Sequence, residues 1–106
     1  MIEKGDIDFG TFHPSQAKTS QELVKVFDEN MATAKEALQK VSDEALDETF
    51  SLKNQGQVLF SSPKKQNVMQ SINHLVHHRA QLTVYMRLND IPVPSIYGPS
   101  ADDRTF

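Results

Sequence analysis

Residues 64–88 read KKQNVMQSINHLVHHRAQLTVYMRL, and neither glycine nor proline interrupts the chain between Pro63 and Pro92. The preceding Ser62-Pro63 is a favourable helix start, with serine as the cap and proline at the first helical position. Asn89-Asp90 are poor helix formers that come shortly before a proline, so they mark the end of the segment. The sequence therefore predicts one helix of about 25 residues here.

Three of the four histidines lie in this segment, at His74, His77 and His78. His74 and His78 are four residues apart, so they share one face of a helix. Two imidazoles at that spacing can hold one divalent metal ion. His77 points about 100° away from His78 around the helix, so a hydrogen bond to a group around the site, or simple exposure, is its better interpretation. His74 and His78 are therefore the candidate metal ligands.

The polar stripe around these histidines has two interpretations. A polar face opposite an apolar one is usually solvated. However, Arg79 is the single charged residue between Gln66 and Met86, and it lies towards the apolar side. A stripe without charge favours a helix covered on all sides, whose polar side lines an internal cavity with a metal as the partner of the imidazoles. The stripe consists of Asn67, Gln70, Ser71, His74, His77, His78, Gln81 and Tyr85.

Other residues of the helix have possible roles beside the pair. Gln81 and Tyr85 could orient a metal-bound water or a substrate, with plain packing as the alternative. Arg79 could clamp a substrate carboxylate, or pair with an acidic residue such as Asp102. A zinc-type site needs three or four protein ligands, and the remaining histidine, His13, lies far away in the sequence. The spacing of the acidic residues singles out none of them as a further ligand.

The first half of the chain predicts a second long helix. Thr19-Ser-Gln-Glu22 has the form of a capping box, and the helix should run from about residue 20 to 41. Ser42–Glu48 fits a short helical turn, and residues 1–18 read as an irregular lead-in. Apolar residues recur in the long helix at spacings of three and four: Leu23, Phe27, Met31, Ala34, Leu38 and Val41.

Two further segments are less regular. Apolar residues alternate on both sides of Asn54-Gln-Gly56, so a short β-hairpin can form between Phe50 and Phe60. The tail from Ile91 to Phe106 contains three prolines and a glycine, which predicts an ordered but irregular arm.

Length and composition limit the class of protein. The 106 residues, 38% of them hydrophobic, suit one domain over residues 1–106 with one modest core. No apolar run exceeds three residues and the N-terminus lacks a secretory h-region, so we expect no membrane span and a cytoplasmic location. The absence of cysteine excludes disulfides, iron–sulfur clusters and thiol nucleophiles. A net charge of −3 without a dense basic patch argues against nucleic acid as a partner.

Two strings carry a resemblance to a known family. The string HLVHHRAQL at residues 74–82 is similar to the HxxHHRGQL signature of the DinB-like (damage-inducible) metalloproteins, with Ala80 where glycine is common. Residues 88–102, LNDIPVPSIYGPSAD, resemble the tail that follows it, and the likeness runs from about residue 15 onward. The resemblance implies a four-helix bundle, often a homodimer, with a divalent ion held by three histidines. It places two ligands on His74 and His78 and none on His77.

The resemblance also implies that something is missing. In the family, the third histidine lies on an earlier helix, and two helices come before the part that corresponds to Met1 of this chain. We therefore expect a truncated domain that corresponds to the C-terminal two-thirds of a family member. Two long helices cannot bury both of their faces alone. We therefore expect an all-α fold: two long helices of a DinB-like bundle, an irregular or hairpin connector and an irregular C-terminal arm, completed by homodimerisation.

Three functions fit the sequence. The first is a metal-dependent hydrolase or thiol transferase that acts on a small-molecule or thiol substrate through Ni, Zn, Fe or Mn. The second is a non-catalytic dimerisation or metal-binding module whose site is incomplete. The third is a helical dimer with hydrogen-bonded histidines and no metal.

Overall fold

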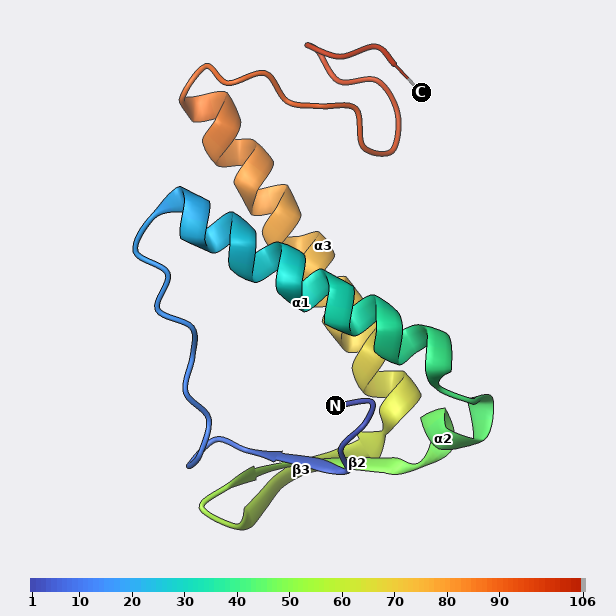
Figure 1. Ribbon diagram of the computed structural model, residues 1–106. Helices are drawn as coiled ribbons and strands as arrows, with labels where there is room; N and C mark the ends of the chain where they lie inside the picture. The colour runs from blue at the N-terminus through green and yellow to red at the C-terminus, as the bar shows by residue number, and fades with distance from the viewer. Residues whose placement is uncertain (106) are drawn as a thin grey trace. The chain divides into compact units, whose positions relative to one another are not determined.

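A computed structural model describes residues 1–105, which form three helices and a three-stranded sheet (Figure 1). The chain divides into two compact units, residues 1–68 and the residues from Met69 onward. The elements in chain order are β1 (Asp6–Asp8), α1 (Ser20–Lys40), α2 (Asp43–Asp47), β2 (Thr49–Asn54), β3 (Gln57–Pro63) and α3 (Lys64–Leu88).

The prediction of an all-α, four-helix-bundle fold is wrong. The described residues form an α/β structure in which β1, β2 and β3 make one mixed sheet, and one of the three helices, α2, is only five residues long. The connector between α2 and α3 forms the expected strands, because its apolar residues alternate with a period of two. The fold class differs because the lead-in adds a third, parallel strand, β1, so that the hairpin becomes part of a sheet.

The expected β-hairpin is present and is formed by β2 and β3. These strands pair antiparallel, with Leu52 opposite Phe60 and Phe50 opposite Ser62. Gln55 and Gly56 connect them and both have positive φ, 50° and 79°. Two such residues are typical of the type I′ turn, whose twist matches that of the flanking strands. The turn sets the pairing of Asn54 with Gln57 and of Lys53 with Val58, and a β-bulge then shifts the register by one residue from Leu52 onward.

The lead-in is less irregular than predicted, because Asp6–Asp8 forms β1 and pairs parallel with β2, with Ile7 opposite Leu52. The Asp8 carboxylate accepts hydrogen bonds from the amides of Gly10 (2.8 Å), Gln55 (2.9 Å) and Gly56 (2.8 Å). The bonds from Gly10 and Gly56 are the main reason that the pKa of Asp8 lies below its ordinary value. One side chain thus attaches the lead-in to the hairpin turn. A three-residue strand leaves too little periodicity to be found in the sequence.

The junction between β3 and α3 holds the buried part of the first unit. Among residues 1–105, Phe50 is the only buried apolar side chain, at 4% exposed, and the polar residues Lys64 and Asn67 are also buried. The Lys64 ammonium lies 2.7 Å from the Glu48 carboxylate. The Asn67 amide donates to Ser62 Oγ (2.7 Å) and to the Pro63 carbonyl (3.0 Å). The Asn67 bonds link the end of β3 to the first turn of α3, which follows β3 directly.

This junction corrects one detail of the predicted helix start. Ser62 and Pro63 are the last residues of β3, and not the cap and the first residue of the helix. The predicted length of about 25 residues agrees with α3, which has 25. The helix ends as expected at Asn89-Asp90, where Asp90 takes a positive φ of 54°.

The first long helix, α1, also begins as predicted. The Thr19 hydroxyl accepts from the Glu22 amide and the Glu22 carboxylate accepts from the Thr19 amide, which completes the capping box. At the start of α2, the Ser42 hydroxyl accepts a hydrogen bond from the Ala45 amide. None of the residues of α1 is buried, and its apolar stripe is about half exposed, for example Leu23 at 61% and Phe27 at 54%.

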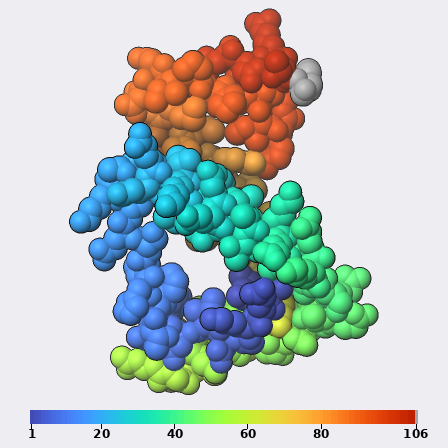
Figure 2. Space-filling view, viewed as in Figure 1, coloured from blue at the N-terminus to red at the C-terminus, as the bar shows by residue number. Residues whose placement is uncertain are grey.

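In the second unit, an irregular but hydrogen-bonded tail follows α3, as predicted. Asp102 accepts from the Val93 amide (2.9 Å) and pairs with the Arg87 guanidinium (2.7 Å). Asp103 accepts from the amides of Ser95 (2.9 Å) and Thr105 (3.0 Å). In the space-filling view, the orange and red side chains of the last turns of α3 and of the tail form one continuous group (Figure 2). Over residues 1–105, no helix has both the length and the hydropathy needed to cross a membrane.

Replacing Phe50 tests the small core of the first unit. We expect Phe50→Ala to lower the free energy of unfolding by about 3 kcal/mol or more, because it removes a buried aromatic ring and leaves a cavity. Phe60→Ala is the matched control, since Phe60 is 39% exposed and should lose about 1 kcal/mol. Urea unfolding followed by circular dichroism measures both, and equal losses would contradict a core centred on Phe50.

The hydrogen bonds that Asp103 accepts in the C-terminal tail should depend on pH. Hydrogen bonds from the Ser95 amide and from Thr105 lower the pKa of Asp103 from 3.8 to about 2. Because the pKa of Asp103 is depressed in the folded protein, these hydrogen bonds stabilise the tail fully above the ordinary pKa. Their contribution to stability is lost as the pH falls from about 4 to about 2. The amide resonances of Ser95 and Thr105 should titrate with a midpoint near 2, and this titration should vanish in Asp103→Asn. A midpoint near the ordinary value would show that these hydrogen bonds do not form.

Candidate metal centre

The two histidines predicted as metal ligands face each other on α3. His74 Nε2 lies 2.8 Å from His78 Nε2, and the ring centroids are 4.4 Å apart with an angle of 58° between the planes. The i, i+4 spacing produces this approach because residues four apart lie one helical turn above each other. Both side chains are exposed, so water, metal ions and small molecules can reach the pair.

A third side chain of the same helix contacts this pair. Gln81 Oε1 lies 2.8 Å from His78 Nδ1, so both ring nitrogens of His78 have hydrogen-bonding partners. Gln81 follows His78 by three residues, a spacing that also places side chains on one side of a helix. The sequence already indicated that Gln81 continues the stripe, but not which ring nitrogen it contacts.

The separation of the two ring nitrogens is that of a hydrogen bond. Zinc binds histidine nitrogens at about 2.0–2.1 Å, so two nitrogens on one tetrahedral ion lie about 3.4 Å apart. The two Nε2 atoms, 2.8 Å apart, would therefore have to move apart, by rotation of one or both rings, to bind one ion.

The pair alone does not complete a metal site. Within residues 1–105, no group of three or more His, Cys, Asp or Glu side chains is placed to hold a metal ion. His13 lies exposed in the lead-in, within the first unit. His77 meets His78 edge to face, with ring centroids 5.3 Å apart. The described residues thus supply two convergent nitrogens, whereas protein zinc sites use three or four protein ligands.

Within this single chain, the polar stripe from His74 to Tyr85 lies on the surface, so the predicted cover by a partner chain stays a prediction. His74, His77, His78, Gln81 and Tyr85 are all exposed. The apolar side of α3 is exposed as well, for example Leu75 at 57% and Leu82 at 60%. The scarcity of charge on this helix therefore does not result from burial within this chain.

Arg79 contacts the tail, although not through the predicted partner. Its guanidinium donates to the Tyr97 hydroxyl and lies over the Tyr97 ring, 4.9 Å from the centroid. Such cation–π contacts contribute about 0.5–1 kcal/mol at exposed sites. Asp102, the predicted partner, pairs with Arg87 instead. No periodicity in the tail points to Tyr97, so this contact could not be predicted from the sequence.

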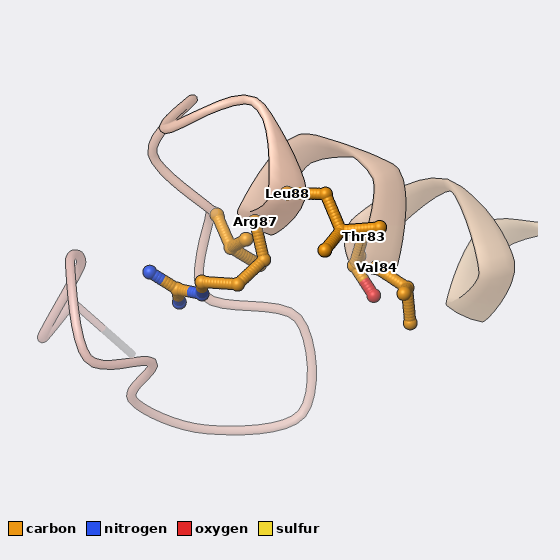
Figure 3. Close-up of a pocket in the computed structure, with 5 residues that line it drawn as sticks. Thr83, Val84, Arg87 and Leu88 are labelled. Carbon is orange, nitrogen blue, oxygen red and sulfur yellow. The ribbon is translucent and has the colours of Figure 1, made fainter.

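A pocket of about 320 Å³ lies where the last turns of α3 meet the tail, and Figure 3 shows the Arg87 side chain extending from the helix towards the tail. At about 100° per residue, Arg87 lies on the opposite side of the helix from His78. The pocket is therefore separate from the histidine pair. Its lining residues are Thr83, Val84, Arg87, Leu88 and Val93.

The family model of the DinB family matches residues 7–105. The chain belongs to the DinB family. The match begins earlier than the predicted start near residue 15, and it includes both strings that carry the resemblance. No curated protein and no solved structure matches the chain at a significant level. Because the DinB family is generally metal-binding, membership agrees with the convergent nitrogens of His74 and His78.

Proposed function

We propose that this DinB-family protein binds a divalent metal ion through His74 and His78. The observation that carries the proposal is the 2.8 Å approach of the two Nε2 atoms on one face of α3. Imidazole suits zinc, iron and nickel, and manganese is a further candidate. The third ligand of the proposed site is a group other than the side chains that lie close to His74 and His78 among residues 1–105.

The proposed reaction class is hydrolysis or thiol transfer on a small-molecule or thiol substrate. A divalent ion, when bound, supplies Lewis acidity for a carbonyl and lowers the pKa of a bound water or thiol. The chain's own contribution is to hold two ligands on a rigid helix and to leave the pair exposed, so that a substrate can reach it. The alternative is a non-catalytic metal-binding module. It is favoured by the absence of a third close ligand among residues 1–105.

We also propose that the protein is a homodimer. Five large apolar side chains of α1 are between 47% and 61% exposed, and α1 has no buried residue. A stable interface buries about 800 Å² on each partner, and an apolar stripe of this kind is a suitable centre for one. A two-fold interface pairs the same patch on both copies, so a second copy is the simplest occupant. The five residues are Leu23, Val24, Phe27, Met31 and Leu38.

Metal analysis tests the site directly. Protein purified without a polyhistidine tag, loaded separately with Zn²⁺ or Ni²⁺ and then dialysed, should retain metal in a fixed ratio to chain. His74→Ala and His78→Ala should reduce the bound metal to background, because each removes one of two convergent ligands. His77→Ala is the matched control and should keep the wild-type ratio.

Two results would contradict the metal proposal. One is folded wild-type protein that retains no metal, and the other is equal loss of metal in all three histidine variants. Turnover of a panel of thiol and ester substrates then separates the two functions. Metal-dependent turnover that is lost in His74→Ala supports an enzyme, and metal binding without turnover supports the non-catalytic module.

Light scattering tests the dimer. The wild type should show twice the mass of the 12.0-kDa chain, with a melting temperature that falls on dilution. Phe27→Glu should give monomer or loss of folded protein, because it places a charge in the apolar stripe. Thr33→Glu adds the same charge about 120° away around α1 and should remain dimeric. A wild type that is monomeric and equally stable at all concentrations excludes the dimer.

A further inference from the structure

His74, His78 and Gln81 form one chain of hydrogen-bonding contacts along α3. Gln81 Oε1 lies 2.8 Å from His78 Nδ1, and His78 Nε2 lies 2.8 Å from His74 Nε2. At about 100° per residue, the three side chains fall within about 60° of one another around the helix. Because a single helix carries all three, their spacing does not depend on how any other element packs.

The first contact in this chain fixes where His78 carries its hydrogen. A neutral imidazole has one donor and one acceptor nitrogen, and the partner of one nitrogen sets the role of the other. The Gln81 amide oxygen accepts only, so His78 Nδ1 is the donor. His78 Nε2 therefore has a free lone pair that points at His74. Free histidine in water favours the opposite tautomer, with the hydrogen on Nε2.

The second contact follows from the first. Since His78 Nε2 is an acceptor, His74 Nε2 donates the hydrogen between the two rings in the metal-free protein. Metal binding then requires a tautomer change of His74 alone. Its Nε2 hydrogen passes to water and its Nδ1 takes a proton from water, with no net change in charge. His78 needs no such change, because its ligating nitrogen is already free.

We infer that Gln81 is a positioning residue that holds His78 in the tautomer able to bind metal through Nε2. The inference rests on the proposed function and deepens it, because it identifies a residue beyond the two ligands. Groups that hydrogen-bond to ligating histidines typically change metal affinity by about 10–100-fold when they are removed. The role of Gln81 is thus separable from that of a residue that only packs.

The tautomer is measured first, on metal-free protein. Long-range ¹H–¹⁵N spectra at about pH 8, where an ordinary imidazole is neutral, should show His78 with its hydrogen on Nδ1. Gln81→Leu should shift His78 towards the Nε2–H tautomer, whereas Gln81→Glu should keep the wild-type tautomer because a carboxylate also accepts. Gln70→Leu, a matched loss of an exposed amide on the same helix, should have no effect. An unchanged His78 tautomer in Gln81→Leu would overturn the inference.

The affinity for Zn²⁺ is measured second, by competition with a chromophoric chelator. Gln81→Leu should weaken binding by about 10–100-fold, and Gln81→Glu and Gln70→Leu should bind at least as well as the wild type. Wild-type affinity in Gln81→Leu, with binding still abolished in His74→Ala, would overturn the positioning role and leave the metal proposal intact. A wild type without zinc binding but with a Gln81-dependent tautomer would overturn the metal proposal and leave the tautomer assignment standing.

Discussion

The helical repeat of α3 is the constraint on which the candidate site depends. Residues three and four apart share one side of a helix, and His74, His78 and Gln81 have these spacings. The two Nε2 atoms therefore approach within 2.8 Å without help from any other element. A helix is also a stiff support, so the pair keeps its geometry while its side chains stay exposed to solvent. This exposure allows a metal ion or a substrate to reach the pair, and no third coordinating side chain lies close to it among residues 1–105.

The small amount of buried apolar surface is the second constraint. Phe50 is the single buried apolar side chain among residues 1–105, and the stripe of α1 is about half exposed. Instead of a large core, polar contacts hold the parts together locally. Asp8 attaches the lead-in to the hairpin turn, Asn67 joins β3 to α3, and Asp103 organises the tail. The apolar side chains that its helices still expose to water are the basis of the proposed homodimer.

Much of the secondary structure could be predicted because it follows local rules. The capping box at Thr19–Glu22, the two-residue turn at Gln55-Gly56 and the helix end at Asn89-Asp90 each depend on residues within a few positions. The fold class was wrong because β1 and its parallel pairing with β2 depend on segments more than 40 residues apart. A three-residue strand has no periodicity that would reveal such a partner.

The sequence by itself determined the helices, the hairpin turn, the facing histidines and, through its two strings, the DinB family. Only the tertiary structure decided the mixed sheet, the burial of Lys64 and Asn67, and the docking of Tyr97 on Arg79. It also decided that the histidine side of α3 is exposed in the described chain. The physical reason is the separation along the chain of the residues involved. The face of a helix is set by residues within one turn, whereas strand pairing and burial depend on contacts between segments that are distant in the sequence.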